Sequence, residues 1–110
     1  PDHGARVATE ILTDAELRAD WESELGDMRK RIAGNRTKLA DALEKALGDD
    51  RFGYLAEQRG MFSVLGFDDD MLTRLRETHG LYLVADGRIN AAGLTDANIP
   101  LVAAAIAAEL

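Results

Sequence analysis

The chain has 110 residues, and its 13 lysines and arginines against 20 aspartates and glutamates give a net charge of −7. This length suits a single domain over residues 1–110, and the acidic balance argues against nucleic acid or an anionic membrane as a partner. No cysteine is available for disulfides or thiolate metal sites, and no apolar run approaches the roughly 18 residues of a membrane span, so we expect a soluble, cytoplasmic protein.

The first half of the chain has the periodicity of helices. Apolar residues at helical spacing predict a short helix over residues 5–12. The following "TDAE" has the pattern of a capping box, in which Thr13 caps a new helix and Glu16 reaches back, so we expect a kink there. From Leu17 onward one apolar stripe predicts a helix of about 34 residues that ends at Gly48. The stripe consists of Leu17, Trp21, Leu25, Met28, Ile32, Leu39, Leu43 and Leu47.

After residue 50 the period changes to that of strands. Alternating Phe52, Tyr54 and Ala56 predict one strand, and the apolar run "GMFSVLGF" over residues 60–67 predicts a second strand that is covered on both faces. Asp68 as N-cap and Gly80 as terminator then bound a helix. The inward-facing residues of this helix are predicted to be Met71, Leu72 and Leu75.

The last third of the chain predicts a β-hairpin and a helix. Residues 81–84 and 88–92 read as strands around Asp86-Gly87, a strong two-residue turn signal. The final helix is expected to have Asn98 as its cap, because a proline at position 100 fits only the first helical turn. The predicted fold class is therefore α/β (or α+β), with a long kinked helix and two further helices packed on a sheet of about four strands.

Few residues qualify as chemical groups on spacing alone. His3 and His79 lack the companions of a metal site, the three acids at residues 68–70 suit a helix start, and the lysines fall on the long charged helix. The spacing around Arg88 favours a strand arginine in a surface ion pair, and Phe62 by itself reads as core. These observations describe an α+β domain without assigning it an activity.

Three longer stretches resemble one family. The opening "PDHGARVATEILTD", the central "QRGMFSVLGF" and the later "LYLVADGRINAAGLT" are similar, in order and spacing, to the C-terminal part of the aspartate and aromatic amino acid aminotransferases. These are pyridoxal-phosphate enzymes of class I and fold type I. The resemblance covers the whole chain and implies the small-domain segment of such an enzyme. The pairing of "GMFS" with "DGR-x-x-x-AG" at this separation is its most specific feature.

The resemblance implies roles for two residues. Arg88 would bind the α-carboxylate of the amino acid or 2-oxo acid substrate, and Phe62 would line the substrate pocket. Small residues after Arg88 would let substrate and cofactor approach. The full-length protein would be a homodimeric transaminase that uses pyridoxal 5′-phosphate.

The resemblance also implies what this segment does not supply. The lysine that bonds to the cofactor, the phosphate-binding residues and the large cofactor-binding domain would lie upstream. The segment would thus contain no catalytic, cofactor-binding or metal-binding residue, would bind no cofactor alone, and would be inactive in isolation. The choice between aspartate and aromatic substrates would rest mainly on other residues. The alternative is a free-standing, non-catalytic domain of the same fold that holds a carboxylate with Arg88.

Overall fold

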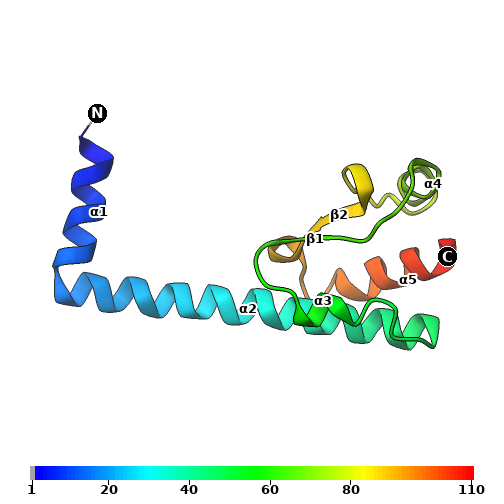
Figure 1. Ribbon diagram of the computed structural model, residues 1–110, viewed down its shortest axis with the longest axis horizontal. Coiled ribbons are helices and arrows are strands. Elements are labelled where there is room, and N and C mark those ends of the chain that lie inside the picture. The colour runs from blue at the N-terminus through cyan, green and yellow to red at the C-terminus, as the bar shows by residue number, and fades with distance from the viewer. Residues whose placement is uncertain (1) are drawn as a thin grey trace. The chain divides into compact units, whose positions relative to one another are not determined.

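The computed structural model describes residues 2–110, so residue 1 of the predicted domain lies outside the described residues. The chain divides into two compact units, one up to Arg31 and one from Ile32 to the C-terminus. Helices dominate, with one small sheet (Figure 1). In chain order the elements are α1 (His3–Thr13), α2 (Ala15–Leu47), α3 (Tyr54–Glu57), β1 (Phe62–Val64), α4 (Asp69–His79), the 3₁₀ turn η1 (Ala85–Gly87), β2 (Arg88–Asn90), the 3₁₀ turn η2 (Ala91–Gly93) and α5 (Ile99–Glu109).

The predicted break between the first two helices is confirmed, but its capping residue differs. Asp14 has an extended backbone, and its Oδ1 accepts hydrogen bonds from the amides of Glu16 at 2.9 Å and Leu17 at 3.0 Å. Thr13, the predicted cap, still belongs to α1, and its hydroxyl donates to the carbonyl of Thr9 at 2.7 Å. A threonine inside a helix commonly bonds back to the carbonyl four residues earlier, which leaves the next residue to cap.

Helix α2 has 33 residues and ends before Gly48, as the apolar stripe predicts. Gly48 has a positive φ of 75°, and its amide donates to the carbonyl of Glu44 at 2.8 Å. The stripe is buried only in its C-terminal half, where Leu39 and Leu43 are at most 1 % exposed. Its first four members keep 41–55 % of their surface exposed; they are Leu17, Trp21, Leu25 and Met28.

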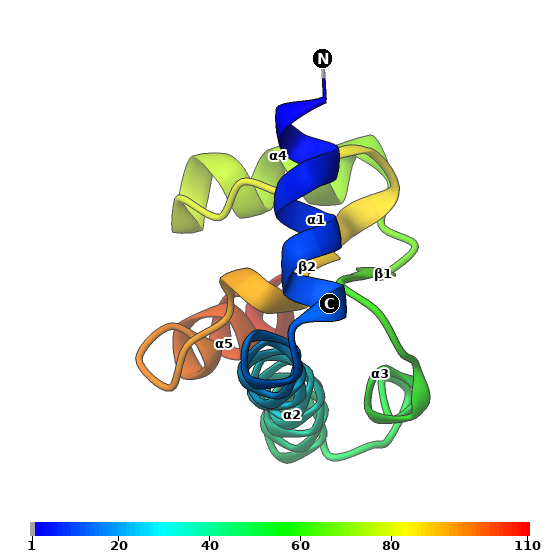
Figure 2. The same ribbon diagram turned by 90° about the vertical axis from the view of Figure 1, so that its left-hand side faces the viewer.

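The core lies entirely in the unit from Ile32 onward. In this unit α3 and α5 flank the C-terminal half of α2, and the two strands lie between α2 and α4 (Figure 2). The largest fully buried side chains come from four of the helices; they are Leu39, Leu43, Leu55, Leu75 and Ile106. The small sheet is therefore held between helices rather than forming a layer of its own.

The sheet is smaller than the predicted four strands. In the part of the chain that the structure describes, β1 and β2 form a two-stranded antiparallel sheet. The strand predicted from Phe52, Tyr54 and Ala56 is wrong, because this segment forms turns followed by α3. Phe52 and Leu55 are the buried residues, at 6 % and 1 % exposed, and a spacing of three belongs to a helical turn.

The expectation for residues 60–67 was wrong on burial. β1 is covered on one face only: Ser63 is 4 % exposed, whereas its neighbours Phe62 and Val64 are 51 % and 48 % exposed. The predicted hairpin is also reduced, because Val84 forms only an isolated bridge with Arg88. β2 pairs instead with β1, which lies more than twenty residues earlier in the chain.

Helix α4 begins and ends as predicted, and α5 begins at the predicted residue. The Oδ1 of Asp68 accepts the amide of Met71 at 2.8 Å, and Gly80 ends α4 with a φ of 64°. Asn98 is the residue before α5, and Pro100 lies in the first turn as predicted. The Asn98 side chain does not cap the helix, however, because its Oδ1 accepts the amide of Thr95 at 2.7 Å instead. None of the helices described in residues 2–110 is long and apolar enough to cross a membrane.

Candidate functional site

The register of the two strands places the predicted site residues on one face of the sheet. Phe62 lies opposite Asn90, and Val64 lies opposite Arg88. Directly opposed residues share a face, and residues two apart on one strand do as well. Phe62 and Arg88 are therefore diagonal neighbours on the exposed face, although the two residues are far apart in the chain.

Arg88 has its guanidinium free for a ligand. The side chain is exposed, and within residues 2–110 its guanidinium makes no hydrogen bond or ion pair. The surface ion pair favoured by spacing alone is thus absent from the described chain. Instead the Cζ atom of Arg88 lies 5.4 Å from the centre of the Phe62 ring. A cation–π contact at an exposed site contributes about 0.5–1 kcal/mol, which orients the guanidinium without occupying its N–H groups.

The turn before Arg88 determines how the chain enters β2. Asp86 and Gly87 have φ values of 62° and 69°, as expected at the two central positions of a type I′ turn. The amide of Arg88 closes the turn by donating to the carbonyl of Ala85. The carbonyls of Asp86 and Gly87 also accept the amides of Gly66 at 2.9 Å and Leu65 at 3.2 Å. The turn is thereby tied to the segment that follows β1.

The small residues after Arg88 have structural partners. Ala91 is 1 % exposed, and its amide donates to the carbonyl of Met61 at 2.7 Å, which continues the pairing of the strands. Asn90 caps the following 3₁₀ turn by accepting the amide of Ala92 at 2.9 Å. At Ala91, therefore, the small side chain is explained by packing in the core.

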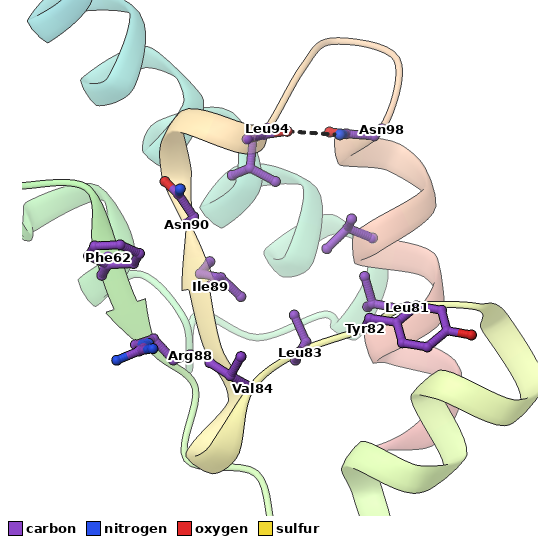
Figure 3. Close-up of a pocket in the computed structure, with 12 residues that line it drawn as sticks. Phe62, Leu81, Tyr82, Leu83, Val84, Arg88, Ile89, Asn90, Leu94 and Asn98 are labelled. Carbon is purple, nitrogen blue, oxygen red and sulfur yellow. Dashed lines mark hydrogen bonds between the residues drawn. The ribbon is translucent and has the colours of Figure 1, made fainter.

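A hollow of about 360 Å³ lies beside β2. In Figure 3, Leu83 and Ile89 point toward α5, whereas Arg88 points away from it, toward β1 and Phe62. Arg88 and Phe62 thus stand at the rim of a largely apolar hollow. Its lining residues are Phe62, Leu81, Tyr82, Leu83, Val84, Arg88, Ile89, Asn90, Gly93, Leu94, Asn98 and Val102.

Two polar residues of α2 support this site and were missed from the sequence. Asn35 and Arg36 are only 6 % and 3 % exposed, and both donate hydrogen bonds to the backbone around the two strands. A sequence signal existed: the apolar stripe has a gap of six residues between Ile32 and Leu39. The inward positions in that gap are filled by this polar pair.

The other polar residues considered from the sequence lie outside the hollow. All three lysines are exposed on α2, and one of them, Lys38, bonds Asp96 at 2.5 Å. His79 lies 3.0 Å from Glu109, and these two join the ends of α4 and α5. Among residues 2–110, the side chains of His, Asp and Glu form no group of three that could hold a metal ion.

Known proteins resemble the chain over nearly its whole length. The family model "Aminotransferase class I and II" matches residues 1–106. The aromatic-amino-acid aminotransferase of Paracoccus denitrificans is 48 % identical over 106 residues, which are 96 % of this chain and 27 % of that protein. The aspartate aminotransferase of Escherichia coli K12 is 43 % identical over 110 residues, all of this chain and 28 % of that protein.

Solved structures agree with the sequence relatives. An aromatic amino acid aminotransferase with 3-indolebutyric acid gives a TM-score of 0.96 at 47 % identity, covering 99 % of this chain and 28 % of its own. The Burkholderia pseudomallei aromatic-amino-acid aminotransferase covalently bound to pyridoxal phosphate gives a TM-score of 0.94 at 44 % identity. That match covers 100 % of this chain and 28 % of the aminotransferase. The chain spans little more than a quarter of the length of these relatives. With a family model matched over 106 residues, the chain belongs to the aminotransferase class I and II family.

Proposed function

We propose that this chain is the C-terminal, small-domain segment of a pyridoxal-phosphate-dependent aminotransferase, in which Arg88 binds the α-carboxylate of the substrate. The observation that carries the proposal is the exposed guanidinium of Arg88, which has no internal partner in residues 2–110 and lies 5.4 Å from the Phe62 ring. An exposed arginine whose N–H groups have no acceptor within residues 2–110, and which lies beside Phe62 and Val64, is suited to bind an anion.

The chemistry of a carboxylate matches this arrangement. A guanidinium offers two parallel N–H donors in a plane, and a carboxylate accepts them as a bidentate pair. Phe62 and Val64 add apolar surface to the same face, beside the guanidinium. Phe62 thus forms one wall of the substrate site and also restricts the motion of the Arg88 side chain.

The cofactor is held by other parts of the full-length protein. Pyridoxal phosphate requires a lysine and a set of phosphate donors, and no lysine lines the hollow beside Arg88. The residues that line this hollow do not fit the cofactor, which supports a role for this chain in substrate capture alone. When bound elsewhere in the protein, the cofactor supplies the transfer of the amino group.

The substrates we propose are an α-amino acid, aspartate or aromatic, and a 2-oxo acid. Relatives named for aromatic amino acids and for aspartate match this chain at similar identity. Both substrate types carry the α-carboxylate that Arg88 would bind, so this interaction serves either class. We further propose that the full-length protein acts as a homodimer in the cytoplasm.

The proposal is tested by replacing Arg88 in the full-length protein. Hydrogen bonds to charged groups contribute about 1.5–3 kcal/mol each. Losing two of them in Arg88→Ala should lower kcat/KM on the order of a hundredfold or more, since 1.4 kcal/mol is tenfold. Arg88→Lys keeps the charge but not the planar donors, so it should recover only part of the loss.

A matched control is Arg76→Ala, which removes an exposed arginine of α4 whose described ion pair is a 3.8 Å contact with Glu77. This control should leave kcat/KM unchanged, because α4 presents Arg76 outside the hollow. Near-native efficiency in both Arg88 variants, with cofactor content and folding intact, would refute the proposed role. A protein that binds 2-oxo acids through Arg88 but transfers no amino group would instead be the non-catalytic binding domain.

A further inference from the structure

Arg36 is a buried arginine whose guanidinium binds the backbone of β1 and its surroundings. Its Nη2 donates to the carbonyl of Gly60 at 2.6 Å and to that of Phe62 at 2.8 Å, while its Nε donates to Gly60 at 3.0 Å. Its Nη1 donates to the hydroxyl of Ser63 at 2.5 Å and to the carbonyl of Leu55 at 3.4 Å. One side chain on α2 therefore holds both ends of the Gly60–Ser63 stretch that carries Phe62.

The partners of Arg36 are all neutral oxygens. Within residues 2–110 it has no carboxylate at ion-pair distance, and burial lowers its pKa from the ordinary value. A buried charge is costly unless hydrogen bonds satisfy it, and an arginine donates from all its N–H groups at any working pH. All but one of the Arg36 hydrogen bonds end on residues 60–63, so the buried guanidinium fixes the backbone of β1 and of the residues just before it.

The preceding residue holds the other strand. The Nδ2 of Asn35 donates to the carbonyl of Ala91 at 3.0 Å and to that of Leu94 at 2.8 Å. Ala91 directly follows β2, which carries Arg88. Two adjacent residues of one rigid helix thus attach separately to the strand of Phe62 and to the end of the strand of Arg88.

We propose that Arg36 is a positioning residue for substrate binding: it sets the place of Phe62 relative to Arg88, with Asn35 holding the end of β2. This inference rests on the proposed function, in which Arg88 binds the substrate carboxylate. Arg36 itself lies beneath the sheet, bonded to the buried Ser63, while Arg88 and Phe62 share the exposed face. It acts through Phe62 and does not contact substrate.

The proposal predicts a specific kinetic pattern. With Arg36 replaced, Arg88 still attracts the carboxylate, but the substrate is held beside a displaced Phe62. Misplacement of about 1 Å caused by a residue away from the chemistry can cost on the order of a hundredfold in rate. We therefore expect kcat to fall by about tenfold to a hundredfold while KM rises less, with the pH profile of kcat unchanged.

The decisive variant is Arg36→Lys in the full-length protein, which keeps the charge but cannot bridge several carbonyls. Ser63→Ala is the milder second variant, since the Ser63 hydroxyl accepts from Arg36 and donates to Gln58 at 2.6 Å. Asp68→Ala is the control, because it removes the N-cap of α4 and lowers stability without touching β1. Crystal structures of the three variants give the distance from the Phe62 ring centre to Arg88 Cζ, independently of activity.

The expected result is a changed distance in Arg36→Lys, away from 5.4 Å, a smaller change in Ser63→Ala and none in Asp68→Ala, with kcat falling in the same order. An unchanged distance, or an equal fall in kcat in the control at equal folded fraction, would overturn the inference. If Arg36→Lys does not fold, Ser63→Ala decides by the same criterion. A displaced Phe62 together with fully active Arg88 variants would refute the proposed function and leave the positioning of Phe62 by Arg36 standing.

Discussion

Gly87, directly before Arg88, should tolerate no side chain, for two separable reasons. Its φ of 69° lies in the left-handed region, where a side chain costs about 1–2 kcal/mol. A Cβ added there would lie 3.1 Å from Cδ2 of Phe67 and 3.2 Å from its Cβ and Cγ. Phe67 is only 7 % exposed, and overpacking a filled core costs about 1–3 kcal/mol. Gly87→Ala should therefore destabilise the turn by about 2–5 kcal/mol.

Two other glycines separate these contributions. Gly48 has a φ of 75° and no atom within 4 Å of an added Cβ, so Gly48→Ala should lose only the conformational part, about 1–2 kcal/mol. Gly93 has neither a positive φ nor a close neighbour. Gly93→Ala should therefore stay within about 0.5 kcal/mol of the parent protein.

The assay is amide hydrogen exchange in the full-length protein, followed over residues 60–67. The amides of Leu65 and Gly66 donate to the carbonyls of Gly87 and Asp86, so they report local opening of this turn. In Gly87→Ala their exchange should accelerate at least about tenfold, the equivalent of 1.4 kcal/mol. Exchange as slow as in Gly93→Ala would show that the turn absorbs a side chain and that the reasoning is wrong.

Two further predictions concern helix ends. Asp14→Ala should cost about 1 kcal/mol and speed amide exchange at the start of α2, because Asp14 accepts the amides of Glu16 and Leu17; unchanged exchange there would contradict the capping role. The hydrogen bond from His79 lowers the pKa of the Glu109 carboxyl below its ordinary value of 4.5. The ionised carboxylate therefore stabilises the folded protein above pH 4.5, and this stabilisation is lost as the pH falls through the lowered pKa. The Tm difference between the parent protein and Glu109→Gln should accordingly be present near pH 7 and shrink below pH 4.5. A Tm difference that stays constant over this range would show that the Glu109 carboxylate does not stabilise the protein in this way.

The sequence alone determined the features whose causes are local. Asp68 begins α4, and Gly80 and Gly48 end α4 and α2, because a carboxylate cap or a left-handed backbone needs only the neighbouring residues. Asp86-Gly87 forms a positive-φ turn for the same reason. The motifs around Phe62 and Arg88 likewise sufficed to indicate the family, which the comparisons confirm.

Only the tertiary structure decided which segments meet. The partner of β2 over its whole length is β1, whereas the nearer residues 81–84 contribute a single bridge, from Val84 to Arg88. The spacing along the chain does not distinguish these two pairings. Phe52 and Leu55 become buried through a single helical turn, although short apolar alternation predicts a strand equally well.

Arg36 is the clearest case of what the sequence could not decide. In the chain it is one of several charged residues on a long helix, and its place in the gap of the apolar stripe indicates an inward side chain without identifying the groups it would bind. Its oxygen partners lie 19 to 27 residues away, on a segment whose position depends on the packed core. Burial of this charge is favourable only once those oxygens are gathered around it, so the fold had to be complete before its role could be recognised.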